Sequence, residues 1–356
     1  MSDQTEALHD ALAFRGTMED IEALLAAGAD VNRRNSSGWT ALQTAAYYGH
    51  RLPGIIERIL DAGADPTIAT FHGHQTALDL AVQRSNIDMV TTFIKRGFDM
   101  THALRWVTLG TLDGLENNPV VPLLLNAGAD VNARVEVSKE SDDLSTHPFD
   151  PVLHRALWNW ETLDDARFLI SIGANPNILS NDGEPPLHMA ARWGCAETTK
   201  ALLEAGADVH AVYKGHTALA EAAFAHDMGC AETVQVLLDH GADANADHAM
   251  SRVWHGEAGI EVVKTLIAAG ADIELKDENG FTPLASHARS HNLPAVEVLI
   301  AAGAKIDVDG KPIEEMYDHC DPMTRATFQR QRLHEAAREA MDEVVAEPAP
   351  SARRRL

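Results

Sequence analysis

The sequence predicts an all-α solenoid, a stack of short helix–turn–helix units with hairpin or loop tips. The main observation is a closing glycine, most often in Gly-Ala-Asp, that recurs at intervals of 35, 34, 31, 45, 33, 35, 29 and 33 residues. A fixed period of about 33 residues is typical of stacked repeats, which bury their apolar faces only against one another. We therefore expect one array over residues 5–308. The closing glycines are Gly28, Gly63, Gly97, Gly128, Gly173, Gly206, Gly241, Gly270 and Gly303.

The first helix of a unit is predicted to begin at a threonine or a proline. A threonine hydroxyl caps a helix by accepting a hydrogen bond from a backbone N–H of the first turn. Proline is tolerated in that turn, because its missing N–H is not needed there. Such an opening occurs at Thr40–Leu42, Pro185–Leu187 and Thr282–Leu284.

The second helix is predicted by leucine or isoleucine pairs that precede the glycine, as in Leu202-Leu203 and Leu299-Ile300. This spacing places an apolar stripe on one helix face. The glycine then ends the helix in a left-handed conformation, which costs glycine little because it has no Cβ. An aspartate two residues later, such as Asp208, is suited to bond backbone groups of the turn.

Two segments carry the clearest copies of this pattern. They are NDGEPPLHMAARWGCAETTKALLEAGADVH (Asn181–His210) and DENGFTPLASHARSHNLPAVEVLIAAGAKI (Asp277–Ile306). Both resemble the ankyrin repeat, and the closing glycines extend the resemblance over about nine units. The resemblance implies an ankyrin-repeat solenoid. It also implies that His9, His154 and His188, which match the histidine of the family's Thr-Pro-Leu-His motif, bridge backbone groups between units.

Some parts of the chain depart from the pattern. The third, fourth and eighth units are degraded, so the pattern does not define their first helices. Residues 134–150 fill the one long interval and are expected to form an insertion, either on a binding face or as a tolerated decoration. Residues 309–346 are expected to form a helical cap, with Leu333, Ala337, Met341 and Val345 as its apolar stripe. Residues 347–356 are expected to be a disordered tail.

The charge of the chain narrows the classes of partner. The formal net charge is −24, which disfavours nucleic acid and anionic membranes because both require cationic contacts. It favours a basic protein partner, or it simply keeps the chain soluble. Three cysteines indicate a reducing compartment. No apolar run approaches the roughly 18 residues of a membrane span, and no basic signal region begins the chain. We expect a cytoplasmic monomer.

We find no motif for catalysis, cofactor or metal. The chain has no phosphate-binding loop, no paired Cys-x-x-Cys and no His-Glu-x-x-His. His287 and His291 are four residues apart, as metal ligands on one helix face can be, but no third ligand accompanies them. The prediction is therefore a non-enzymatic protein without cofactor or metal.

The resemblance places partner contacts at the ends of the first helices and at the hairpin tips. Aromatic residues stand at these positions although they make up only 5% of the chain, and Trp, Tyr and Arg dominate binding hot spots. The alternative is that these rings pack against neighbouring units. The predicted partner-binding residues are Trp39, Tyr47, Tyr48, Arg192, Trp193, Phe224 and Phe281.

These features of the sequence predict two alternative functions. The first is a non-catalytic scaffold or inhibitor that binds a protein through the concave face of the solenoid. The second is a bacterial secreted effector, or a toxin-neutralising immunity protein, whose array targets a host or toxin protein. In that second case the insertion or the tail would supply activity or regulation.

Overall fold

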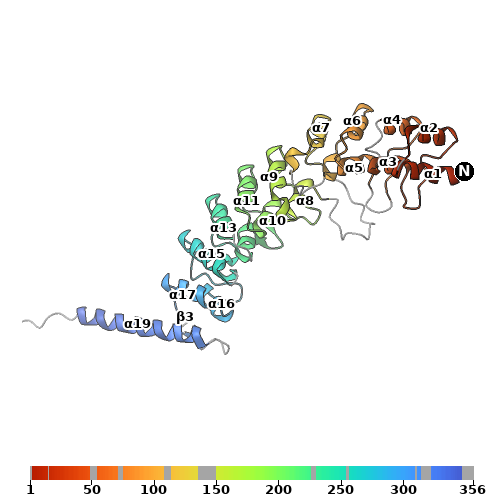
Figure 1. Cartoon of the computed structure of the whole chain (residues 1–356). Coiled ribbons are helices and arrows are strands. Elements are labelled where there is room, and N and C mark those ends of the chain that lie inside the picture. The colour runs from red at the N-terminus through yellow and green to blue at the C-terminus, as the bar shows by residue number, and fades with distance from the viewer. Residues whose placement is uncertain are drawn as a thin grey trace, which may run out of the picture. The chain divides into compact units, whose positions relative to one another are not determined.

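The computed structural model describes residues 2–14, 16–48, 54–70, 75–107, 114–134, 150–225, 230–253, 256–308, 311–313 and 322–346. Over these residues the chain is a succession of short paired helices, which confirms the predicted all-α class (Figure 1). The chain divides into two compact units. The first holds residues 1–189 and 204–206, and the second holds residues 190–203 and 207–356. Of the predicted insertion at 134–150, the structure describes the two end residues, Arg134 and Asp150. The predicted tail lies outside the described residues.

The first unit begins with regular helix pairs and continues with shorter elements. Helix α3 packs against α1 and α5, so the first helices of successive pairs stack on one another. The elements are α1 (Ser2–Ala13), α2 (Met18–Ala26), α3 (Ala41–Tyr48), α4 (Ile55–Asp61), α5 (Ala77–Gln83), α6 (Ile87–Lys95), η1 (Ala103–Trp106), η2 (Leu115–Asn117), α7 (Val120–Asn126), α8 (Val152–Leu157), η3 (Trp160–Thr162) and α9 (Leu163–Ser171).

The second unit repeats the same packing and ends in a long helix. Helix α14 packs against α12 and α16, and the second helices α13, α15 and α17 pack in the same order. The unit boundary falls within α10 (Pro186–Arg192) and α11 (Ala196–Glu204). The later elements are β1 (Val212–Tyr213), β2 (His216–Thr217), α12 (Ala218–Phe224), α13 (Cys230–Asp239), η4 (Ala246–His248), α14 (Ala249–Arg252), α15 (Glu257–Ala268), α16 (Pro283–Arg289), α17 (Leu293–Ala301), β3 (Asp307–Val308), β4 (Lys311–Pro312) and α19 (Pro322–Ala346).

The caps and closing turns are as the sequence predicts. The Thr282 side chain accepts a hydrogen bond from the backbone N–H of Ala285, and Pro283 occupies the first turn of α16. Leu202 is fully buried, and its carbonyl accepts a bond from Ala207 N at 2.9 Å in the closing turn. Gly206 has φ +95° there, with open space where a Cβ would lie. Backbone conformation, and not crowding, therefore requires glycine at this position.

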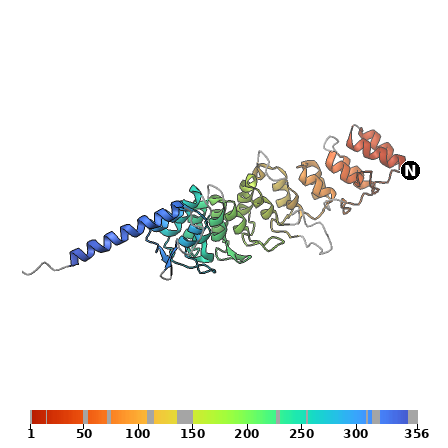
Figure 2. The same ribbon diagram turned by 90° about the horizontal axis from the view of Figure 1, so that it is seen from below.

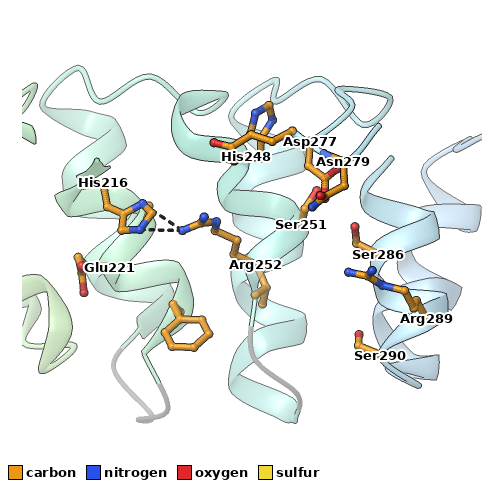
Figure 3. Close-up of a pocket in the computed structure, with 14 residues that line it drawn as sticks. His216, Glu221, His248, Ser251, Arg252, Asp277, Asn279, Ser286, Arg289 and Ser290 are labelled. Carbon is orange, nitrogen blue, oxygen red and sulfur yellow. Dashed lines mark hydrogen bonds between the residues drawn. The ribbon is translucent and has the colours of Figure 1, made fainter. Parts of the chain in front are cut away.

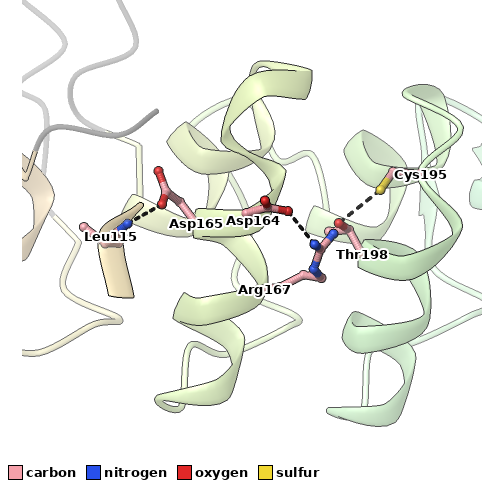
Figure 4. A network of polar contacts seen from close by, with 6 residues as sticks. All are labelled: Leu115, Asp164, Asp165, Arg167, Cys195 and Thr198. Carbon is pink, nitrogen blue, oxygen red and sulfur yellow. Dashed lines mark hydrogen bonds and ion pairs between the residues drawn. The ribbon is translucent and has the colours of Figure 1, made fainter. Parts of the chain in front are cut away.

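The degraded units differ from one another. The third unit has a regular first helix, α5, because Thr76 and Asp79 form a reciprocal capping box. In the described part of the fourth unit, the short 3-10 helices η1 and η2 stand in place of a first helix. The buried Asp165 of α9 fastens η2 by accepting a hydrogen bond from Leu115 N at 2.6 Å (Figure 4). In the eighth unit the first helix, α14, is four residues long.

Asparagine side chains connect the turns of successive repeats. Asn32 donates from Nδ2 to the carbonyl of Gly63 at 3.0 Å, and its Oδ1 accepts from Asp65 N at 2.7 Å. One side chain therefore holds two backbone groups of the next turn. Thr67 stands at the same place in its repeat but donates to Asp65 within its own turn. We call a bond between an asparagine side chain and the backbone of the next turn an asparagine bridge. Such bridges are made by Asn32, Asn132, Asn177 and Asn245.

Helix α19 packs on α17 through its beginning. Thr324 and Phe328 are fully buried, and Arg332 pairs with Asp307 at 2.7 Å. The predicted stripe is wrong at Leu333, which is 73% exposed, because it follows the turns that contact the array. The side chains of Ala337, Met341 and Val345 lie outside the described ones. Beyond its first turns α19 runs on as one helix in both views (Figures 1 and 2).

Two cysteines of the second unit are free thiols. Cys195 is half-buried and Cys230 is buried. The Cys195 thiol donates to Thr198 Oγ1 at 3.2 Å (Figure 4), and the Cys230 thiol donates to the carbonyl of Ala225 at 3.3 Å. Both act as small side chains that satisfy local groups. Cys320 lies outside the described residues.

Candidate protein-binding surface

Three of the predicted site residues meet in the first unit. The ring centroids of Trp39 and Tyr47 are 4.9 Å apart, and those of Tyr47 and Tyr48 are 4.7 Å apart, both edge to face. The guanidinium carbon of Arg84, from the next repeat, lies 3.6 Å from the centroid of Tyr47. Tyr48 is 41% exposed. We call Trp39, Tyr47, Tyr48 and Arg84 the aromatic cluster.

A tight turn positions the tryptophan of this cluster. Asn35 N donates to the carbonyl of Trp39 at 2.8 Å, and Asn35 Oδ1 accepts from Trp39 N at 3.0 Å. The second unit builds the same turn at Phe281. Asp277 N donates to the Phe281 carbonyl at 2.8 Å, and Asp277 Oδ1 accepts from Phe281 N at 2.9 Å. Each turn therefore holds an aromatic ring at a hairpin tip.

The remaining predicted residues lie in the second unit, at helix ends or, for Phe281, at a hairpin tip. Trp193 and Phe224 are 36% and 50% exposed. Arg192 pairs with Glu221 through Nε at 3.3 Å. Phe281 is half-buried, and the Arg289 guanidinium carbon lies 4.6 Å from its centroid. The rings of Trp193 and Phe224 thus reach the surface, while the ring of Phe281 contacts Arg289.

A cavity of about 650 Å³ opens among α12, α14 and α16. We call it the α14 groove. In Figure 3 Arg252 reaches from α14 toward α12, and Ser286, Arg289 and Ser290 extend from α16 toward α14. The Arg252 Nη1 lies 3.0 Å from Nδ1 of His216 and 3.2 Å from its Nε2, so the guanidinium contacts the edge of the imidazole ring.

Three polar atoms of this groove are buried without a hydrogen-bond partner. They are Oγ of Ser251, Oγ of Ser286 and Nδ1 of His248. Ser286 as a whole is only 7% exposed. Buried polar groups are nearly always hydrogen-bonded, because losing water without replacement is costly. Three such atoms around one cavity therefore point to a polar ligand.

The motif histidines are structural. His9 Nε2 donates to the carbonyl of Arg33 at 3.3 Å, and His154 Nε2 donates to the carbonyl of Glu184 at 2.9 Å. These bonds to the following repeat confirm the predicted bridges of His9 and His154. His188 is fully buried. Burial lowers the pKa of both His9 and His154, against the opposing effect of these carbonyl bonds. Both rings are therefore neutral near pH 7.

His287 has a similar role in the opposite direction. Its Nε2 donates to the carbonyl of Met250 in the preceding repeat at 2.8 Å, and its Nδ1 faces Asn292 at 3.3 Å. His291 lies in the turn after α16 at φ +60°.

Among the described residues no group of three or more His, Cys, Asp or Glu side chains is arranged to hold a metal ion. The described helices also include none long and apolar enough to span a membrane.

A family model described as ankyrin repeats matches residues 7–103 and 153–248, more than half of the chain. The chain belongs to the ankyrin repeat family. Ankyrin repeats are protein interaction modules, so the chain has a role in protein–protein interaction.

Several proteins are similar to parts of the chain. The human B-cell lymphoma 3 protein is 32% identical over 226 residues, which is 59% of this chain and 46% of that protein. Fowlpox virus ankyrin repeat protein FPV031 is 30% identical over 169 residues, 45% of each chain. Ankyrin repeat protein L86 of Acanthamoeba polyphaga mimivirus is 28% identical over 167 residues, 45% of this chain and 24% of that protein. The chain spans less than half the length of each of these relatives.

The ankyrin pattern missed part of the surface. Arg252 ends α14 as Arg289 ends α16, but the degraded eighth repeat gave no register from which to place it. The sequence signal that could have found Arg252 is the arginine that recurs at the ends of first helices, as at Arg192 and Arg289. Arg84, which stacks on Tyr47, is likewise not among the predicted partner-binding residues.

Proposed function

We propose that the chain is a non-catalytic scaffold or inhibitor that binds a protein partner at the ends of its first helices. The aromatic cluster carries this proposal. Trp, Tyr and Arg are the residue types that dominate binding hot spots, where rings are set in place and partly exposed before binding. In the cluster, contacts among Trp39, Tyr47 and Arg84 orient the rings, and Tyr48 remains exposed. Trp193 and Phe224 extend the same kind of site in the second unit.

The partner that the net charge favours is basic. Charges spread over the whole chain act mainly on the encounter between molecules, because salt screens them within about 8 Å at physiological ionic strength. A basic partner would therefore associate more slowly as salt is raised. The effector or immunity alternative places an activity in the insertion or the tail, and no feature of the described residues favours it.

Alanine substitution of two exposed rings tests the surface. Truncating a central aromatic anchor typically costs about 2 kcal/mol, which is roughly thirty-fold in affinity. We expect Tyr48→Ala and Trp193→Ala each to weaken binding by about that factor in titrations with the partner captured from source cells. Binding kinetics at two salt concentrations report on partner charge in the same samples.

The matched control is Leu333→Ala, which truncates another exposed apolar side chain away from the first helices. It should bind as the parent does. If folded Tyr48→Ala and Trp193→Ala variants also bind as tightly as the parent, the ends of the first helices are not the binding surface.

A further inference from the structure

The α14 groove holds two arginines within a chain of net charge −24. Arg252 and Arg289 have no carboxylate partner among the described residues; their contacts are with the rings of His216 and Phe281. A guanidinium presents several N–H donors in a fixed plane that matches a carboxylate. Contact with a neighbouring ring leaves most of these donors unused.

The acidic side chains that line the groove are already engaged or lie at its edge. Glu221 pairs with Arg192 at 3.3 Å. Asp277 Oδ1 accepts from the backbone N–H groups of Asn279 and Phe281 in the tip turn. Glu278 is an exposed residue of that turn. The carboxylates therefore leave the two guanidiniums available, yet they oppose a dense anion such as a phosphate chain.

We propose that the α14 groove binds an extended acidic segment of the protein partner. This inference rests on the proposed function and names the chemistry of the segment. One carboxylate side chain of the segment pairs with Arg252 and another with Arg289. The orphaned hydroxyls of Ser251 and Ser286 donate to the segment, and Phe224 offers an apolar contact at the groove wall.

The stacking of the repeats sets the spacing of the two acids. Arg252 and Arg289 end α14 and α16, which are neighbouring first helices. Packed helices lie about 8–10 Å apart, and an extended chain advances about 3.3 Å per residue. The matching segment therefore carries acidic residues about three positions apart.

This segment is compatible with a partner that is basic overall. Net charge governs the approach of two molecules, whereas the groove selects the few residues that dock into it. A nucleic acid or a doubly charged phosphate meets Glu221, Asp277 and Glu278 at short range. The local acids thus favour single carboxylates over such ligands.

Fluorescence anisotropy with short labelled peptides and the full chain tests the segment. The first peptide has two glutamates three positions apart in a neutral polar sequence; the others replace glutamate with glutamine, with lysine or with phosphoserine. We expect the glutamate peptide alone to bind well. Arg252→Gln and Arg289→Gln should each weaken it about tenfold or more, as for lost hydrogen bonds to a charged group, and Ser286→Ala should weaken it less.

The control removes the same charge elsewhere. Arg325→Gln and Arg330→Gln alter exposed arginines of α19, and peptide binding should not change. The proposal is overturned if the glutamate peptide does not bind the parent at millimolar concentration. It is equally overturned if the glutamine or phosphoserine peptide binds as well, or if the Arg252→Gln/Arg289→Gln double variant binds like the parent.

Binding of the captured partner to both sets of variants distinguishes a failure of this inference from a failure of the proposed function. If Trp193→Ala weakens partner binding as expected and the Arg252→Gln/Arg289→Gln variant binds normally, the surface is correct and the acidic segment is not. If both sets of variants bind normally, the surface itself is wrong. If both lose binding while Arg325→Gln/Arg330→Gln does not, both conclusions stand.

Discussion

Single buried residues join one repeat to the next. His154 donates to the carbonyl of Glu184, and the low pKa of its buried ring keeps it neutral. In the unfolded chain the same histidine takes up a proton near its ordinary pKa of 6.5. Below that pH the unfolded state binds more protons than the folded state, so stability falls as pH falls. His9 acts in the same sense.

Replacing His154 should flatten this dependence. In His154→Gln the free energy of unfolding should fall less steeply between pH 7 and pH 5, by at most about 1.4 kcal/mol per pH unit. Denaturant titrations at several pH values measure the slope. His210→Gln, at an exposed position, should keep the slope of the parent; an unchanged slope in His154→Gln would contradict the assignment.

The half-buried carboxyl of Asp79 affects the pH dependence of stability in the opposite direction. Burial raises the pKa of Asp79, despite its bonds to Thr76. The folded state then holds the proton at a pH where the unfolded carboxyl, with its ordinary pKa of 3.8, has lost it. This group therefore contributes stability as pH falls toward 4. The histidine comparison relies on a difference between variants, in which the contribution of Asp79 cancels.

Whole elements were predictable where local chemistry decides them. Thr76 and Thr282 cap their helices by accepting hydrogen bonds from the first turn. Gly206 ends a helix because it adopts a positive φ angle. Helix α14 was not predictable, because it begins after Asp247 and His248, two consecutive left-handed residues without a threonine or proline signal. The α14 groove was hidden for the same reason. The groove is also lined by side chains from three helices, and no single repeat contains all three.

The start of α19 tests the predicted C-terminal cap. The periodicity of Leu333 and the residues after it was correct for a helix, but sequence alone could not show which turns meet the array. Phe328→Ala should lose about 3 kcal/mol of unfolding free energy, the usual cost of emptying a buried phenylalanine site.

Leu333→Ala should leave stability within about 0.5 kcal/mol, as exposed substitutions do. Urea titrations with fluorescence detection compare the two variants. Equal stability of Phe328→Ala and the parent would show that α19 is a free tail, whereas the predicted loss would support the cap.

At the scale of the whole molecule, the two compact units bear on cooperativity. The stability of a repeat array is a sum of intrinsic and nearest-neighbour terms, so weak repeats can divide it. The short elements η1, η2 and α14 replace regular first helices in the fourth and eighth repeats. We therefore expect thermal unfolding in more than one step.

Matched core substitutions can assign these steps. Leu42 lies in the first unit and Leu237 in the second, and both are fully buried. Leu42→Ala and Leu237→Ala should each lower a different transition in calorimetry, by the equivalent of about 2–5 kcal/mol. A single transition that both variants shift equally would mean that the two units unfold together.

The asparagine bridges have a mechanical consequence. Tension applied between the two ends of the chain passes through the turns one after another. Where Asn32 holds both Gly63 and Asp65, two hydrogen bonds share the load and must break together before that turn can open. Thr67 bonds to Asp65 within its own turn, and among the described residues it makes no such bond across the next junction. Under a pulling force the junctions would therefore open at different forces. The junction after Thr67 would open before the junction that Asn32 holds.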